Sequence, residues 1–242
     1  MKPLTVIIFS IFLFACNSQH KKETFKVGND ISKHDTVQND VYEIPYFNFD
    51  TTIIINNKPF KIKTKIFNDY LESISVNSIF LDTLYRDGIN NIEFIDFNKD
   101  SCKDILVSYR GNNVINDIYM FDSKNSLFKK IKGFESYPEA VQLKSKPTFY
   151  YSYHRAGCAD MNWISDLFTI ENFKIIHLGH IYGMSCERDP QVIEIYRILD
   201  NNDEQQKLIE KLSYSKTISQ YDDKWDFIEK YWNLNYKKFA NN

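Results

Sequence analysis

Apolar side chains recur at every second position in many short segments of this chain, and Gly, Pro, Asn or charged residues separate the segments. The pattern is clearest where Phe60, Ile62 and Ile66 alternate with lysines. A period of two predicts strands that bury one face, and the Asn56-Asn57 turn predicts a hairpin between the first two strands. The predicted strands cover residues 51–55, 60–66, 73–81, 92–95, 105–109, 115–121, 127–131, 140–143, 148–153, 164–170, 173–181 and 191–199.

The period changes near the C-terminus. Asp222 or Asp223 can cap a helix, and large apolar residues then follow three or four apart: Trp225, Ile228, Trp232, Tyr236 and Phe239. We expect a helix over residues 222–239 that packs on a sheet, the alternative being a helix that lies on a membrane or binds a partner. The prediction is a mainly β fold of antiparallel sheets, as a sandwich or a propeller-like meander, closed by this C-terminal α-helix. Residues 42–242 form one domain in this interpretation.

The N-terminus indicates export. Residues 4–15 are apolar except for Thr5 and Ser10, a run too short to span a membrane but typical of a signal peptide. The run ends in Leu13-Phe14-Ala15-Cys16, which resembles the lipobox of bacterial lipoproteins. That resemblance implies a signal peptide over residues 1–15 and a lipidated Cys16 that anchors the chain in the bacterial cell envelope, on the periplasmic or surface face. Residues 16–41 are polar and predict a flexible tether.

The net charge restricts the kinds of partner, and the cysteines bear on the redox state of the compartment. The formal net charge of −2 and the lack of a basic stripe argue against nucleic acid as a partner. Beyond Cys16 the chain has Cys102, Cys158 and Cys186, an odd number. Disulfides persist in exported proteins, and we favour a Cys158–Cys186 bond because both lie in turn-like segments, while a bond through Cys102 stays open.

The best chemical signal is the segment 96–104, where Asp96, Asn98, Asp100 and Asp104 stand at the first, third, fifth and ninth places between two predicted strands. Calcium prefers such interleaved oxygen ligands. The strand–loop–strand pattern resembles the calcium loop of FG-GAP and VCBS-type repeats. The resemblance implies that these four side chains and the backbone carbonyl of Cys102 bind a structural calcium ion.

The loop departs from related calcium loops in two places. Ser101 stands where a sharp turn favours Gly, and Val107 cannot supply the bidentate carboxylate that an EF-hand takes from its twelfth position. The alternative is therefore an Asx-rich turn that hydrogen-bonds its own backbone. A second acidic turn, at residues 200–203, is expected to be solvated, with an ion site as the alternative.

Two further segments carry candidate chemistry. His154, Arg155, Asp160 and Trp163 predict a polar pocket with aromatic walls for a small anionic or sugar-like ligand. The alternative is a disulfide-anchored turn in which Arg155 pairs with Asp160. His177 and His180 would point to opposite faces of a regular strand, so they can share a metal only if the backbone turns at Gly179.

These features lead to three expectations for function. The first is a non-catalytic binding or scaffolding protein of the envelope, with a glycan or protein ligand, because the chain has no Walker loop, G-x-S-x-G or H-E-x-x-H motif. The alternative is an envelope hydrolase or metal-dependent enzyme that uses the pocket near His154, Arg155 and Asp160. A third is an immunity or inhibitor-like protein that docks a partner through the aromatic turn at residues 150–163.

Overall fold

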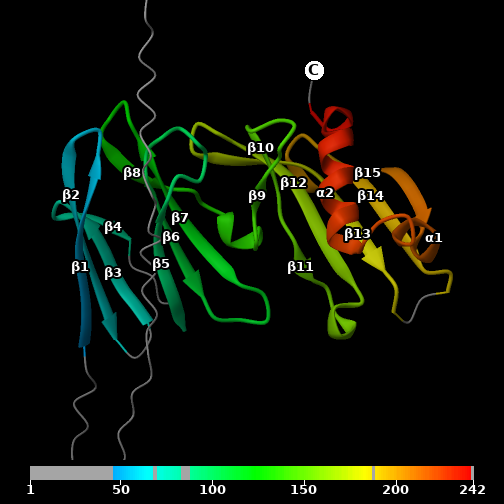
Figure 1. Cartoon of the computed structure of the whole chain (residues 1–242), viewed down its shortest axis with the longest axis horizontal. Coiled ribbons are helices and arrows are strands. Elements are labelled where there is room, and N and C mark those ends of the chain that lie inside the picture. Colours follow the sequence, from blue (N-terminus) through cyan, green and yellow to red (C-terminus); the bar gives the residue numbers. More distant parts are fainter. Residues whose placement is uncertain (1–45, 68–69, 83–87, 187–188, 241–242) are drawn as a thin grey trace, which may run out of the picture.

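The computed structural model of the chain describes residues 46–67, 70–82, 88–186 and 189–240. Within these ranges the chain forms three antiparallel sheets that follow one another in sequence, and a helix near the C-terminus covers the third (Figure 1). This confirms the predicted mainly β class. The predicted signal peptide, Cys16 and the tether lie outside the described residues.

The first sheet has the order β1 (Tyr46–Ile55), β2 (Lys58–Phe67), β3 (Tyr70–Val76) and β4 (Ile79–Asp82). Asn56 and Asn57 both have positive φ, which places the predicted β1–β2 turn where the sequence indicates it. The single strand predicted at residues 73–81 is wrong, because Asn77 and Ser78 also take positive φ and turn the chain into a hairpin.

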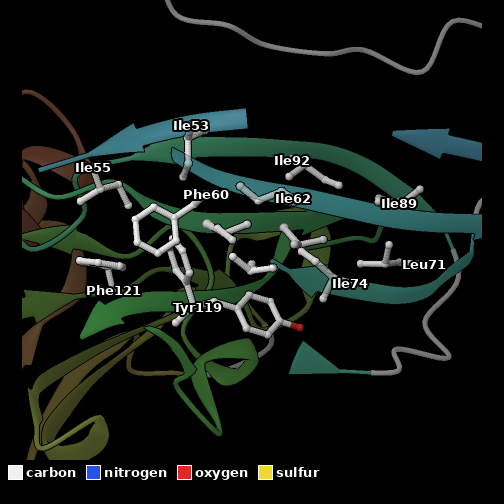
Figure 2. Close-up of a cluster of buried hydrophobic side chains, with 14 of the residues drawn as sticks. Ile53, Ile55, Phe60, Ile62, Leu71, Ile74, Ile89, Ile92, Tyr119 and Phe121 are labelled. Atoms are coloured by element: carbon white, nitrogen blue, oxygen red, sulfur yellow. The ribbon is translucent and has the colours of Figure 1, made fainter. Parts of the chain in front are cut away.

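The second sheet contains β5 (Ile89–Ile95), β6 (Asp104–Tyr109), β7 (Ile115–Asp122) and β8 (Leu127–Lys130), and it is the middle layer. On one face Tyr119 and Phe121 of β7 join a core with Phe60 and other residues of the first sheet (Figure 2). On the other face Ile118 and Met120 pack into a second core with residues of the third sheet. Strand β7 is therefore buried on both faces.

The third sheet begins with β9 (Val141–Gln142), β10 (Phe149–Tyr151), β11 (His154–Arg155) and β12 (Trp163–Glu171). It continues with β13 (Lys174–Met184), β14 (Val192–Leu199) and β15 (Asn202–Ser213). Strand β15 was not predicted. It is an edge strand with mostly exposed polar residues, so it shows no clear apolar alternation. Short helical turns precede β9 and β12, at η1 (Phe134–Ser136) and η2 (Cys158–Asp160).

A short helix α1 (Tyr214–Ile218) leads to the main helix α2 (Lys224–Asn235), which continues into η3 (Tyr236–Lys238). The Asp223 side chain caps α2 by accepting from the backbone N–H of Asp226 at 2.9 Å. Trp232 is fully buried against the third sheet, and its indole N–H donates to Ser165 Oγ at 2.9 Å. The predicted helix on a sheet is therefore confirmed. In the described part of the chain, no helix combines the length and apolarity that crossing a bilayer requires.

The predicted Cys158–Cys186 disulfide is present and joins η2 to the segment after β13. Around it, the Asn162 side chain accepts hydrogen bonds from the backbone N–H groups of Ser185 and Cys186, each at 3.1 Å. Cys102 is a buried free thiol whose pKa is raised, mainly by burial. The pairing that the sequence left open is thus settled in favour of the two turn cysteines.

Candidate functional site

The segment 96–104 is a tight loop that joins β5 to β6. Asp96 accepts hydrogen bonds from the backbone N–H groups of Asp100 and Ser101, at 2.9 and 3.0 Å. Asp100 accepts from the backbone of Cys102 at 2.8 Å. Ser101 has φ 70°, so it adopts the left-handed conformation for which Gly is usually required. The loop therefore has the Asx-turn bonding of the alternative interpretation, in which the exposed Asp96 and Asp100 accept hydrogen bonds from the backbone of the loop itself.

Asp104 lies at the buried end of this loop. Asp104 is 0% exposed. Its carboxylate accepts hydrogen bonds from the backbone N–H groups of Phe97, at 3.1 Å, and Phe121, at 2.8 Å. Burial raises the pKa of Asp104 to about 7; the two backbone N–H groups oppose this rise, and the nearby charges of Asp100 and Asp96 add to it. One side chain thus ties the loop to strands β6 and β7.

The loop also contacts the third sheet. The ring of Phe97 stacks on Tyr150 at a centroid distance of 4.9 Å and meets the edge of Phe134 at 5.4 Å. Gln142 of β9 donates to the backbone carbonyl of Asn98 at 3.3 Å. The 96–104 loop is therefore part of the junction between the second and third sheets.

The predicted pocket residues make contacts other than those expected. Asp160 pairs with Lys224 of α2 at 2.7 Å and also accepts from the Tyr153 hydroxyl, so Lys224 takes the place expected for Arg155. Burial raises the pKa of Asp160, but hydrogen bonds from Lys224 and Tyr153 and the charges of Lys224 and Arg155 outweigh burial and lower it. Arg155 is exposed. His154 instead lies 3.9 Å from Asp166, which belongs to another group of side chains.

Trp163, expected as an aromatic wall, belongs to the core. It is 0% exposed, its indole N–H donates to the Tyr214 hydroxyl at 3.1 Å, and its ring fills the space above Gly183. The segment 150–163 therefore serves mainly to connect the third sheet to α2.

A cluster that the sequence did not predict lies on β12 and β13. Asp166 and His180 are cross-strand neighbours, but the register shifts between Leu167 and Phe168, which pair with Gly179 and His177. Leu178 is the extra residue of this β-bulge. The bulge brings His177 to the same face as His180. One donor atom from each of Asp166, His177 and His180 lies within 4.8 Å of the others.

His177 is the centre of this cluster. Its Nε2 lies 3.3 Å from Asp166 Oδ1, and its Nδ1 lies 2.6 Å from Asp203 Oδ1. Burial lowers the pKa of His177, but hydrogen bonds and charge from Asp166 and Asp203 outweigh burial and raise it. For His180, burial dominates and the pKa is lowered. The pKa of His177 is therefore shifted upward and that of His180 downward.

A surface cavity of about 430 Å³ lies between α2 and the start of the third sheet, and we call it the Trp225 cavity. The Trp225 ring is centred 3.6 Å from the Tyr153 ring and is 41% exposed. Val141 and Tyr151 supply further apolar lining. The remaining lining residues are acidic: Glu139, Asp222, Asp223, Asp226 and Glu229.

Comparison with known proteins gives one structural likeness. No family model and no curated protein matches the chain. A solved structure, described as that of a Xanthomonas type IV secretion system related protein, is similar with a TM-score of 0.43 and 14% sequence identity. The alignment covers 72% of this chain and 98% of that one. At this level of similarity the match identifies neither a family nor a function.

Proposed function

We propose that this protein is a lipid-anchored binding protein of the bacterial cell envelope, without catalytic activity, whose 96–104 loop holds a structural calcium ion. The lipobox-like Leu13–Cys16 segment supports the anchor. The Cys158–Cys186 disulfide agrees with an oxidising compartment. Substituting Cys16→Ser should abolish incorporation of radiolabelled fatty acid and move the protein from the membrane fraction to the soluble fraction. Labelling of the variant equal to wild type would contradict the anchor.

The calcium proposal rests on the position of the loop. Asp96, Asp100 and Asp104 bring three carboxylates into nine residues, and Asp104 is fully buried. A carboxylate has about four lone-pair sites, so acceptance of backbone N–H groups leaves sites for a cation. A calcium ion would offset the repulsion between the carboxylates. Because Phe97 and Asn98 contact the third sheet, a rigid loop would stabilise the junction of the two sheets.

Thermal unfolding tests this calcium site. A ligand present at about 100 times its Kd adds about 2.7 kcal/mol, which corresponds to a Tm increase of about 5–10 °C for a chain of this size. We expect this increase when millimolar calcium replaces chelator, and we expect Asp96→Ala to remove it. The matched control is Asp200→Asn, which removes a carboxylate from the exposed turn between β14 and β15 of the third sheet. A wild-type Tm that is the same in calcium and in chelator would contradict the calcium site.

The Trp225 cavity is the observation that carries the binding role. An exposed indole provides a flat apolar face, and the surrounding carboxylates accept hydrogen bonds from hydroxyl groups. A cavity that combines an aromatic wall with a few polar groups is typical of small-ligand sites. The excess of carboxylates disfavours an anionic ligand. We therefore propose a neutral glycan as the ligand of this cavity.

Tryptophan fluorescence titration with neutral oligosaccharides, such as dextran and chitin fragments, tests the glycan proposal. Trp225→Ala should weaken binding about tenfold or more, a loss of about 1.4 kcal/mol. Leu234→Ala is the matched control, because Leu234 lies on the same helix, is 77% exposed and does not line the cavity. Equal affinity of both variants, or no binding by the wild type, would contradict the proposal.

A further inference from the structure

We propose that Asp166, His177 and His180 bind a divalent transition-metal ion, with zinc as the ion to test, and that His154 completes the ligand set. These residues come from neighbouring strands β11, β12 and β13. The site is separate from both the calcium loop and the Trp225 cavity, so it can be tested independently of the proposed function.

The spacing of the donor atoms fits a small tetrahedral ion. Zinc bonds to His nitrogen and carboxylate oxygen are about 2.0–2.1 Å long, so two ligand atoms of a tetrahedral site lie about 3.3 Å apart. His177 Nε2 and Asp166 Oδ1 are 3.3 Å apart, and one ligand atom from each of Asp166, His177 and His180 lies within 4.8 Å of the other two. His154 lies outside this group of three, so its ring must move toward the other ligand atoms to join them.

The partners of His177 favour a cation at this position. Asp203 accepts from Nδ1 at 2.6 Å, the arrangement in which a carboxylate orients a metal-binding imidazole and directs Nε2 to the ion. The neighbours of Nε2 are the backbone carbonyl of Gly179 at 3.1 Å and Asp166, and both are acceptors. A neutral His177 with its proton on Nδ1 would place a lone pair against two acceptors. A bound cation, or a second proton on the ring, removes this conflict.

His154 supplies the remaining donor. Its Nδ1 is buried, makes no hydrogen bond in the described part of the chain and lies 3.9 Å from Asp166 Oδ2. The ring as a whole is partly exposed, as is that of His180. The cluster lies on the sheet face opposite α2, because the alternating residues Ser165 and Gly179 face that helix. This face also packs against Tyr137 and the second sheet, so an ion would reach the cluster past the partly exposed rings of His154 and His180.

The donor types distinguish this site from the calcium loop. Imidazole is a preferred ligand of zinc, copper, iron and nickel, whereas calcium binds oxygen ligands. Three imidazoles and one carboxylate therefore select a transition ion even when calcium is in large excess. This selectivity makes the two metal sites separable in one experiment.

The test is isothermal titration of the chain with zinc chloride in millimolar calcium, without a polyhistidine tag. His20 and His34 are replaced by Ala in every sample, because they are the other histidines of the chain. We expect one zinc ion per chain. His177→Ala and His180→Gln should each weaken binding at least 100-fold. Asp203→Asn should weaken it about 10–100-fold, the effect expected for a residue that orients a ligand.

A second measurement uses other variants, in case His177→Ala or His180→Gln does not fold. Cobalt added in place of zinc should give the visible absorption of a tetrahedral ion, and His154→Ala should change that spectrum while Arg155→Ala, the adjacent exposed residue, leaves it unchanged. Absence of zinc binding by the reference chain would overturn the proposal. Undiminished binding by folded His180→Gln would overturn it as well.

Discussion

Among the described glycines, Gly183 leaves the least room for a side chain. A Cβ at this position would lie 2.1 Å from Cε2 of Trp163, whose ring is fully buried and cannot move away. We expect Gly183→Ala to lower the free energy of unfolding by about 3 kcal/mol, the upper part of the usual range for overpacking. Urea unfolding followed by circular dichroism measures the loss.

Gly133→Ala is the matched control for this substitution. A Cβ at Gly133 meets no atom within 4 Å. Only the φ of +84° therefore disfavours Ala here, and we expect it to lower the free energy of unfolding by about 1–2 kcal/mol. If both variants lost the same stability, the contact between Gly183 and Trp163 would not be the cause.

Single residues also show where sequence reasoning stops. The spacing of His177 and His180 predicts opposite faces, and only the bulge at Leu178 reverses that prediction. A bulge depends on how two strands pair, so it cannot be read from one strand. By contrast, the Cys158–Cys186 pairing could be anticipated, because both residues lie in turn-like segments. The ion pair of Asp160 could not be predicted, because its partner Lys224 lies 64 residues away in sequence.

At the scale of elements, the N-cap of α2 depends on one side chain. Asp223 accepts from Asp226 N at 2.9 Å, whereas the neighbouring Asp222 side chain is not in the capping position. Asp223→Ala should destabilise the protein by about 1 kcal/mol, the usual loss for an N-cap aspartate. Thermal unfolding of this variant beside Asp222→Ala measures the effect. A larger loss in Asp222→Ala would show that the cap is assigned to the wrong residue.

Some strands and helices could be predicted from the sequence and others could not. Strands with strict alternation, such as β2, and the capped helix α2 were found close to their observed bounds. Strand β15 was missed because its polar residues face solvent at the sheet edge, where burial leaves no pattern. The sequence predicts one strand where the structure has the β3–β4 hairpin, because Asn77-Ser78 is a weaker turn signal than a pair with Gly.

At the scale of the whole molecule, the three sheets are stacked so that the middle one has two cores. The apolar run Ile118–Phe121 is a sequence sign of a strand covered on both faces, since consecutive residues point to opposite faces. The partners on each face could not be predicted, because they come from segments far apart in the chain. The 96–104 loop contacts both the second and third sheets, so the proposed calcium ion would stabilise their junction.

Native mass spectrometry of the mature protein tests the structural ion most directly, because it counts bound calcium per chain. We expect one calcium ion on the wild-type chain and on Asp200→Asn, and none on Asp96→Ala at the same free calcium concentration. A wild-type chain that binds no calcium, or an Asp96→Ala chain that keeps the ion, would contradict it.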